Sequence, residues 1–201
     1  MNEGFFSLSK EKQQRIINMG FQVFSQNTYK KAPVAEIASR AGISKALLFY
    51  HFKNKKELYL FLWNKSMELT RIAMKEQDVL GTNNYFEMLR RSLTGKCNLL
   101  REYPYVSEFS LRAYYEESIE VKREIQDSFQ LINLESERKS FEVIDLGLLR
   151  DDIDIHQMYQ EMIWAADGYL HMAFMQGGID VDKLKSDFEK LILMWEKVYQ
   201  K

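Results

Sequence analysis

The chain has 201 residues, a formal net charge of −1, and only 2 Pro and 9 Gly. Because helix breakers are few and strong helix formers are abundant, the composition favours an all-α protein. The sequence contains no apolar run of about 18 residues and no basic-then-apolar leader, which argues against a transmembrane helix, a secretory signal and a membrane partner.

The charge is divided unevenly along the chain. Residues 1–60 contain ten Lys or Arg and four acidic residues, a net charge of +6, whereas the remainder contains 18 basic and 25 acidic residues, a net charge of −7. A basic first part beside an acidic remainder predicts that only the first part meets a polyanion.

The first three predicted helices are short and lie close together. Ser9 is a suitable N-cap for a helix over residues 10–25, and Asn27 after it suits the left-handed conformation that often ends a helix. Pro33 suits the first turn of a second helix over residues 33–41. Gly42 suits a tight turn with positive φ, and Ser44 suits the N-cap of a third helix that ends near residue 52.

Helical spacing continues to the end of the chain. An Asn54–Glu57 capping box predicts a helix over 54–78, and the Gly- and Asn-rich residues 81–84 interrupt the pattern. Further helices are predicted over 85–101, 105–115, 118–147, 155–176 and 181–199. The last two carry an unusual amount of large apolar surface.

The stretch from Pro33 to Phe52 has the order helix, Gly-containing turn, helix, which is the unit that places a recognition helix in the major groove of DNA. Leu48 and Phe52 are predicted to pack inward. This leaves an outer face made of Lys45, Ala46, Phe49, Tyr50 and His51. Their donors suit phosphates and base edges, and a small residue such as Ala46 allows close approach to the groove.

These residues carry a resemblance. The stretch FQVFSQNTYKKAPVAEIASRAGISKALLFYHFKNKKELY resembles the DNA-binding domain of the TetR family of bacterial transcriptional regulators. The sequence departs from the usual family pattern at Phe49, where Tyr is common, and at Thr28 and Pro33. The DNA contacts that the resemblance implies fall on Lys30, Lys31, Arg40, Ser44, Lys45, Ala46, Phe49, Tyr50, His51 and Lys55.

The resemblance also implies an architecture of about nine helices. A three-helix DNA-binding domain over residues 1–53 would precede an effector-binding and dimerisation domain over 54–201, with the helix over 54–78 connecting them. We expect a cytoplasmic homodimer formed through the last two helices, which represses from a palindromic operator in double-stranded DNA until a small apolar or aromatic effector binds. Candidate effector-pocket residues are Trp63, Met67, Met88, Cys97, Phe109, Phe129 and Trp164.

Other functional classes remain open at this point. Cys97 is the only cysteine and cannot form an intramolecular disulfide, which fits a reducing compartment. The three histidines show no pairing typical of a metal site, so no metal, cofactor or enzymatic activity is predicted. A helical protein–protein interaction module and a DNA-binding protein that does not repress are the alternatives to a repressor.

Overall fold

The computed structural model describes residues 3–201, in which nine α-helices and two short 3₁₀-helices are the regular elements apart from one isolated β-bridge. The all-α prediction is confirmed. The chain divides into two compact units, one of Met1–Glu68 with Tyr103–Gln130 and the other of Leu69–Glu102 with Leu131–Lys201. These units are grouped by packing, and the division of function at residues 53 and 54 stays a prediction.

The first unit begins with the 3₁₀-helix η1 (Glu3–Phe5) and the helix α1 (Lys10–Gln26). Ser9 caps α1 as predicted, because its Oγ accepts a hydrogen bond from the Lys12 amide at 3.4 Å. The prediction for Asn27 is wrong, since its backbone is extended with φ −136°. Its side-chain amide instead donates to the Val23 carbonyl at 2.8 Å, which satisfies an acceptor in the last turn of α1.

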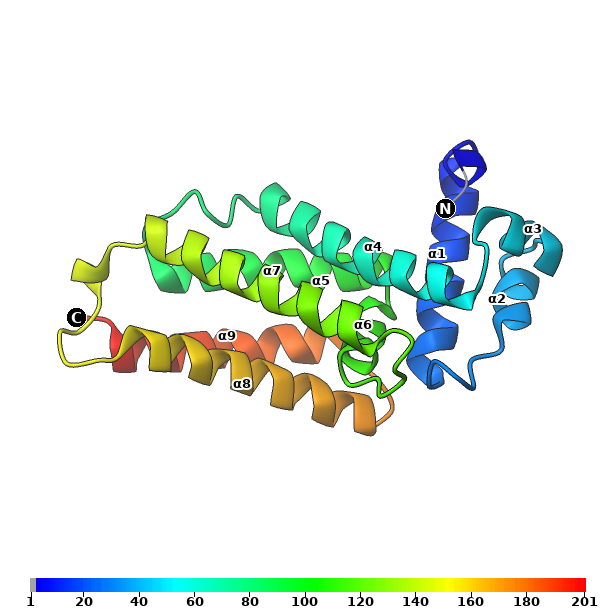
Figure 1. Ribbon diagram of the computed structural model, residues 1–201. Helices are drawn as coiled ribbons and strands as arrows, with labels where there is room; N and C mark the ends of the chain where they lie inside the picture. Colours follow the sequence, from blue (N-terminus) through cyan, green and yellow to red (C-terminus); the bar gives the residue numbers. More distant parts are fainter. Residues whose placement is uncertain (1–2) are drawn as a thin grey trace. The chain divides into compact units, whose positions relative to one another are not determined.

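The helices α2 (Val34–Arg40) and α3 (Lys45–His51) follow, joined by a short turn (Figure 1). Gly42 has φ +72° in this turn, as predicted, a conformation that is easy for glycine alone. Pro33 precedes α2 rather than lying in its first turn, and its carbonyl accepts from the Glu36 amide at 2.8 Å. The predicted inward-facing residues Leu48 and Phe52 are fully buried.

Three more helices contribute to the first unit: the first part of α4 (Lys55–Glu76), all of α6 (Val106–Tyr114) and the first part of α7 (Lys122–Val143). Asn54 starts α4 as predicted, because its Oδ1 accepts from the Glu57 amide at 2.8 Å. Helix α6 packs along α1. The Phe109 ring of α6 lies 5.2 Å from the Phe21 ring of α1 and 5.3 Å from the Tyr59 ring of α4, so an aromatic core joins these three helices.

The second unit contains α5 (Tyr85–Glu102), the 3₁₀-helix η2 (Leu146–Leu148), α8 (Ile155–Met175) and α9 (Val181–Tyr199). Helix α5 packs against α9. The Glu161 carboxylate of α8 accepts hydrogen bonds from the Trp195 indole at 3.2 Å and the Tyr199 hydroxyl at 2.6 Å, which ties α8 to α9. Among residues 3–201, no helix combines the length and apolar character that crossing a membrane requires.

Candidate nucleic-acid interface

The outer face of α3 carries four of the residues that are predicted to contact DNA. Ser44, Lys45, Ala46 and Tyr50 are exposed, Tyr50 to 61%. The Ser44 Oγ accepts from the Leu47 amide at 3.1 Å, which caps the helix and leaves the hydroxyl proton able to donate outward. Because α3 has seven residues and Leu48 faces the core, the side chains of this face point away from the rest of the unit.

Phe49 is half-buried, and its ring interacts with Lys45 although it has no hydroxyl to bind a phosphate. The Lys45 Nζ lies 5.9 Å from the centroid of the Phe49 ring, one helical turn away. A cation over an aromatic face is attracted to it, so Phe49 restrains the ammonium group on the outer face of α3.

The loop between α1 and α2 supplies further positive charge through Lys30 and Lys31, both exposed. Lys55, at the start of α4, holds this loop from one side. Its Nζ donates to the Lys30 carbonyl at 2.9 Å and the Ala32 carbonyl at 3.3 Å, and it lies 5.2 Å from the Tyr29 ring. Two of the three ammonium protons of Lys55 are therefore used within the protein.

Arg40, at the end of α2, forms an ion pair with Glu36 one turn earlier, and both side chains are about 40% exposed. An exposed pair of this kind contributes little to stability, and the guanidinium keeps donors for a phosphate.

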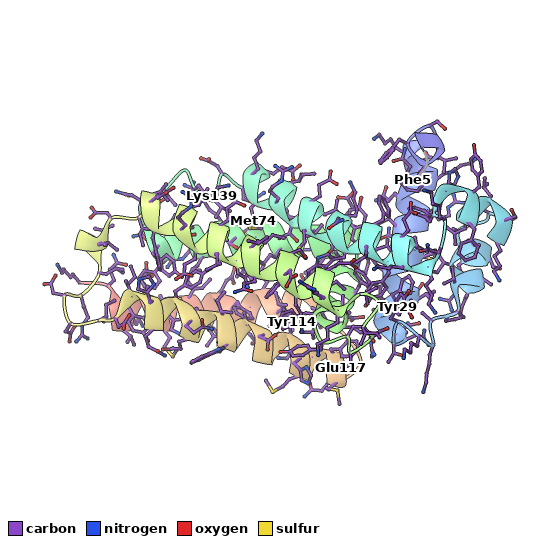
Figure 2. The ribbon with its side chains drawn as sticks, viewed as in Figure 1. Phe5, Tyr29, Met74, Tyr114, Glu117 and Lys139 are labelled. Atoms are coloured by element: carbon purple, nitrogen blue, oxygen red, sulfur yellow. The ribbon has the colours of Figure 1, made fainter. Side chains whose placement is uncertain are left out.

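The structure contradicts the predicted place of His51 on the outer face. His51 is 2% exposed, and neither ring nitrogen has a hydrogen-bond partner among the described residues. The reason is the N-terminal segment: the Phe5 ring lies 5.9 Å from the His51 ring and also packs on Phe52 and Phe61. Figure 2 labels Phe5 in the segment before α1. Burial lowers the pKa of His51, because the apolar site disfavours the charged ring.

Arg15 of α1 is a candidate that the sequence prediction missed. Its Nη1 lies 3.6 Å from the position that a Cβ at Gly42 would occupy, so the guanidinium is beside the turn between α2 and α3. The sequence marks Arg15 only as part of the polar face of α1, because no local pattern shows which turn that face meets. Its position places a positive charge next to the turn that precedes α3.

The candidate effector residues divide between the two units. Phe109 belongs to the aromatic core of the first unit, where Met67 is half-buried and the buried Trp63 donates from its indole to the Ser128 hydroxyl at 2.7 Å. The Phe129 ring lies 6.3 Å from the Trp63 ring and 4.6 Å from the Tyr114 ring.

Three candidates lie in the second unit. Met88 and Cys97 are buried, and burial raises the pKa of the Cys97 thiol. Trp164 is 60% exposed because it lies on the outer side of α8, so it does not line an interior of this unit.

A pocket found in the second unit is lined by other residues, namely Leu134, Glu137, Arg138, Phe141, Glu142 and His156. Within residues 3–201, no group of three or more metal-ligating side chains gathers.

Known proteins match the part of the chain that contains α2 and α3. The family model for bacterial regulatory proteins of the tetR family matches residues 16–61, which span most of α1, all of α2 and α3, and the start of α4. The chain is similar to YerO, an uncharacterised HTH-type transcriptional regulator of Bacillus subtilis (strain 168), with 27% identity over 130 residues. That match covers 64% of this chain and 44% of YerO, so the chain spans less than half of that relative's length.

Solved structures share the fold over nearly the whole chain. A TetR family transcriptional regulator from Chloroflexus aurantiacus J-10-FL superposes with a TM-score of 0.68 at 21% identity, covering 100% of this chain and 98% of the other. The TetR-like regulator LfrR from Mycobacterium smegmatis, solved in complex with proflavine, has a TM-score of 0.62 at 17% identity, covering 92% and 96%.

Proposed function

Because the chain belongs to the TetR family of bacterial regulatory proteins, we propose that it is a sequence-specific DNA-binding transcriptional regulator, and specifically a repressor that a small effector releases from DNA. The observation that carries this proposal is the outer face of α3. It presents Ser44, Lys45 and Tyr50 to solvent on a helix whose inner residues are buried, next to a loop with two exposed lysines.

In this proposal α3 enters the major groove. Lys45 reaches a phosphate or a guanine edge, and Ala46 allows the helix to approach the groove wall. Lys30, Lys31, Arg40 and Arg15 then lie where phosphates flank the groove. Counterion release by these cations supplies the sequence-independent part of the affinity, which matches the +6 charge of residues 1–60.

A homodimer formed through α8 and α9 is the second part of the proposal. Seven large apolar side chains of these helices are exposed: Ile163, Trp164, Met172, Met175, Leu193, Met194 and Val198. Gly168 lies inside α8, and a Cβ built there meets nothing within 4 Å. Since glycine inside a helix costs about 1 kcal/mol relative to alanine, close approach by a partner helix is a physical reason for its presence.

Two-fold symmetry follows from such an interface. A dimer would present two α3 helices to half-sites about 34–36 Å apart, or a multiple of that, and would read a palindrome. A single α3 contacts too few base pairs for useful specificity, so the dimer is the functional unit in this proposal.

The effector is proposed to be a small apolar or aromatic molecule bound in the C-terminal part of the chain. The fold shared with LfrR, which was solved with the aromatic molecule proflavine, supports this class of ligand. The effector must bind the DNA-free conformation more tightly than the DNA-bound one, because only differential affinity shifts an equilibrium. The candidate lining residues stay a proposal for each unit by itself: Trp63, Met67, Phe109 and Phe129 in the first unit, and Met88 and Cys97 in the second.

The test uses Lys45→Ala with Lys75→Ala as a matched control. Both lysines are exposed on helices, but Lys75 lies at the end of α4. We expect Lys45→Ala to weaken binding to a selected duplex by about 1–3 kcal/mol if it reads a base edge, or to reduce the salt slope by about 1 if it meets a phosphate. Lys75→Ala should bind as the unchanged protein does.

Equal affinity and equal salt dependence in all three proteins would contradict a DNA-reading α3. That outcome would favour a helical module for binding another protein, in which α3 plays no part.

A further inference from the structure

The loop that carries Lys30 and Lys31 is held by a segment far away in the sequence. The Tyr29 amide donates to Oε2 of Glu116 at 2.7 Å, and the Tyr29 hydroxyl donates to Oε2 of Glu120 at 2.9 Å. Both carboxylates belong to the residues between α6 and α7, within the same compact unit as the loop. Figure 2 labels Tyr29 in the loop after α1 and Glu117 in the segment after α6.

Glu116 is unusual because its carboxylate is buried. The residue is 8% exposed and Tyr29 is 3% exposed. A buried carboxylate is costly unless its oxygens are hydrogen-bonded, and here each oxygen is satisfied by a backbone amide: Oε2 by Tyr29 and Oε1 by Ser118 at 3.0 Å. This pairing fixes the loop relative to the segment after α6, because both amides must stay in place for the charge to remain buried.

The same part of the chain also holds the end of α1. The Arg112 Nε donates to the Ser25 carbonyl at 2.6 Å, and the Gln22 amide donates to the Tyr105 hydroxyl at 2.9 Å. Burial, followed by the hydrogen bond to Glu120, raises the pKa of Tyr29, so its hydroxyl stays a donor at neutral pH. Helix α6 and the residues after it therefore contact the end of α1 and the loop at several points.

We propose that Glu116, supported by Glu120, is a positioning residue for DNA binding, which sets the place of Lys30, Lys31 and the start of α2. The inference rests on the proposed function. It adds a site for control of DNA affinity that lies outside α3, and it names the class of contact involved: a buried carboxylate bound to the backbone of the lysine-bearing loop.

Electrostatics separates this role from a general effect of charge. A carboxylate close to a DNA-binding surface repels phosphates, so removing it should strengthen binding if charge alone mattered. Positioning predicts the opposite sign. Glutamine at position 116 can accept from only one of the two amides, since its NH₂ group is a donor, and alanine can accept from neither.

The experiment compares Glu116→Gln and Glu116→Ala with Glu117→Gln in the full-length protein. Glu117 is the matched control: it lies in the same segment, the substitution changes the charge equally, and its side chain is 80% exposed beside Lys122. Two quantities are measured: the Kd for the duplex recovered by selection from random DNA, and amide hydrogen exchange over residues 28–32 without DNA.

We expect Glu117→Gln to bind as tightly as the unchanged protein or slightly more tightly. Glu116→Gln should bind about tenfold more weakly, and Glu116→Ala more weakly still, because a hydrogen bond to a charged group is lost in each case. The Tyr29 amide should exchange faster in both Glu116 variants and unchanged in Glu117→Gln. If Glu116→Ala does not fold, Glu116→Gln carries the comparison.

The inference is overturned if Glu116→Gln binds DNA as well as Glu117→Gln does, whatever happens to exchange. It is also overturned if the Tyr29 amide is as well protected from exchange in Glu116→Gln as it is in Glu117→Gln. Failure of the proposed function is distinguishable from these results, because in that case the unchanged protein itself selects no duplex, while hydrogen exchange still measures the contact between Glu116 and the loop.

Discussion

The imidazole of His51 shows how one buried contact changes the chemistry of a residue on α3. Leu48 and His51 are three positions apart on α3, so both point to the same inner side of the helix. Phe5 covers His51 and leaves both ring nitrogens without partners among the described residues. A neutral ring fits this site better than a charged one, and the lowered pKa follows from that.

A dependence of stability on pH follows from this burial. The folded-state pKa of His51 lies below its unfolded value of about 6.5, so the unfolded state binds more protons and stability is lost as pH falls through the folded pKa. We expect the free energy of unfolding to fall between pH 7.5 and pH 5 by more in the unchanged protein than in His51→Phe. Urea denaturation at several pH values measures this, with a slope from one histidine of at most about 1.4 kcal/mol per pH unit. Parallel pH profiles would show that His51 does not titrate in an apolar site.

Residue roles were predictable from the sequence where they depend on the residue's own helix. Ser9, Gly42 and Ser44 act as predicted, because caps and positive φ are local properties. The surroundings of His51 and Lys55 were not predictable, because they come from distant segments: Phe5 covers His51, and the carbonyls of Lys30 and Ala32 accept from Lys55. The DNA contact of Lys55 stays a prediction. Spacing patterns in the sequence do not predict contacts between residues that are far apart in the chain.

At the scale of elements, apolar periodicity determined most helices to within a few residues. The predicted helix over 118–147 is the clearest difference, since α7 runs from Lys122 to Val143 and η2 follows it. The Ser118 carbonyl accepts from the amides of Val121 and Lys122, so these residues form a turn before the helix begins. Glu116 went unnoticed in the sequence because a glutamate between two helices usually lies in solvent.

The outer faces of α8 and α9 support a prediction about assembly. Trp164→Glu would place a charge on the apolar surface of the proposed interface, so we expect it to shift the protein from dimer to monomer in sedimentation equilibrium. Leu131→Glu is the matched control, because Leu131 is also a large exposed apolar residue, 68% exposed, but lies on α7. It should leave the dimer intact. A dimer that persists in Trp164→Glu and dissociates in Leu131→Glu would place the interface elsewhere.

At the scale of the whole molecule, the charge division of the sequence and the fold point to the same function. The basic part of the chain contains α1, α2 and α3, and the acidic remainder contains the helices with the exposed apolar faces. A polyanion is expected to meet only the first of these, and a second copy of the chain only the other. The sequence alone predicts which part of the chain meets DNA and which part meets a second copy. The contact between Glu116 and the loop that carries Lys30 and Lys31 is visible only in the structure.

The most direct test of the account is selection of bound fragments from random duplex DNA by the full-length protein. A dimer that presents two copies of α3 should enrich one palindromic sequence whose half-sites are separated by about one helical turn, 34–36 Å, or a multiple of it. Enrichment of no sequence, or of a single half-site without symmetry, would contradict a dimer that reads DNA through two copies of α3.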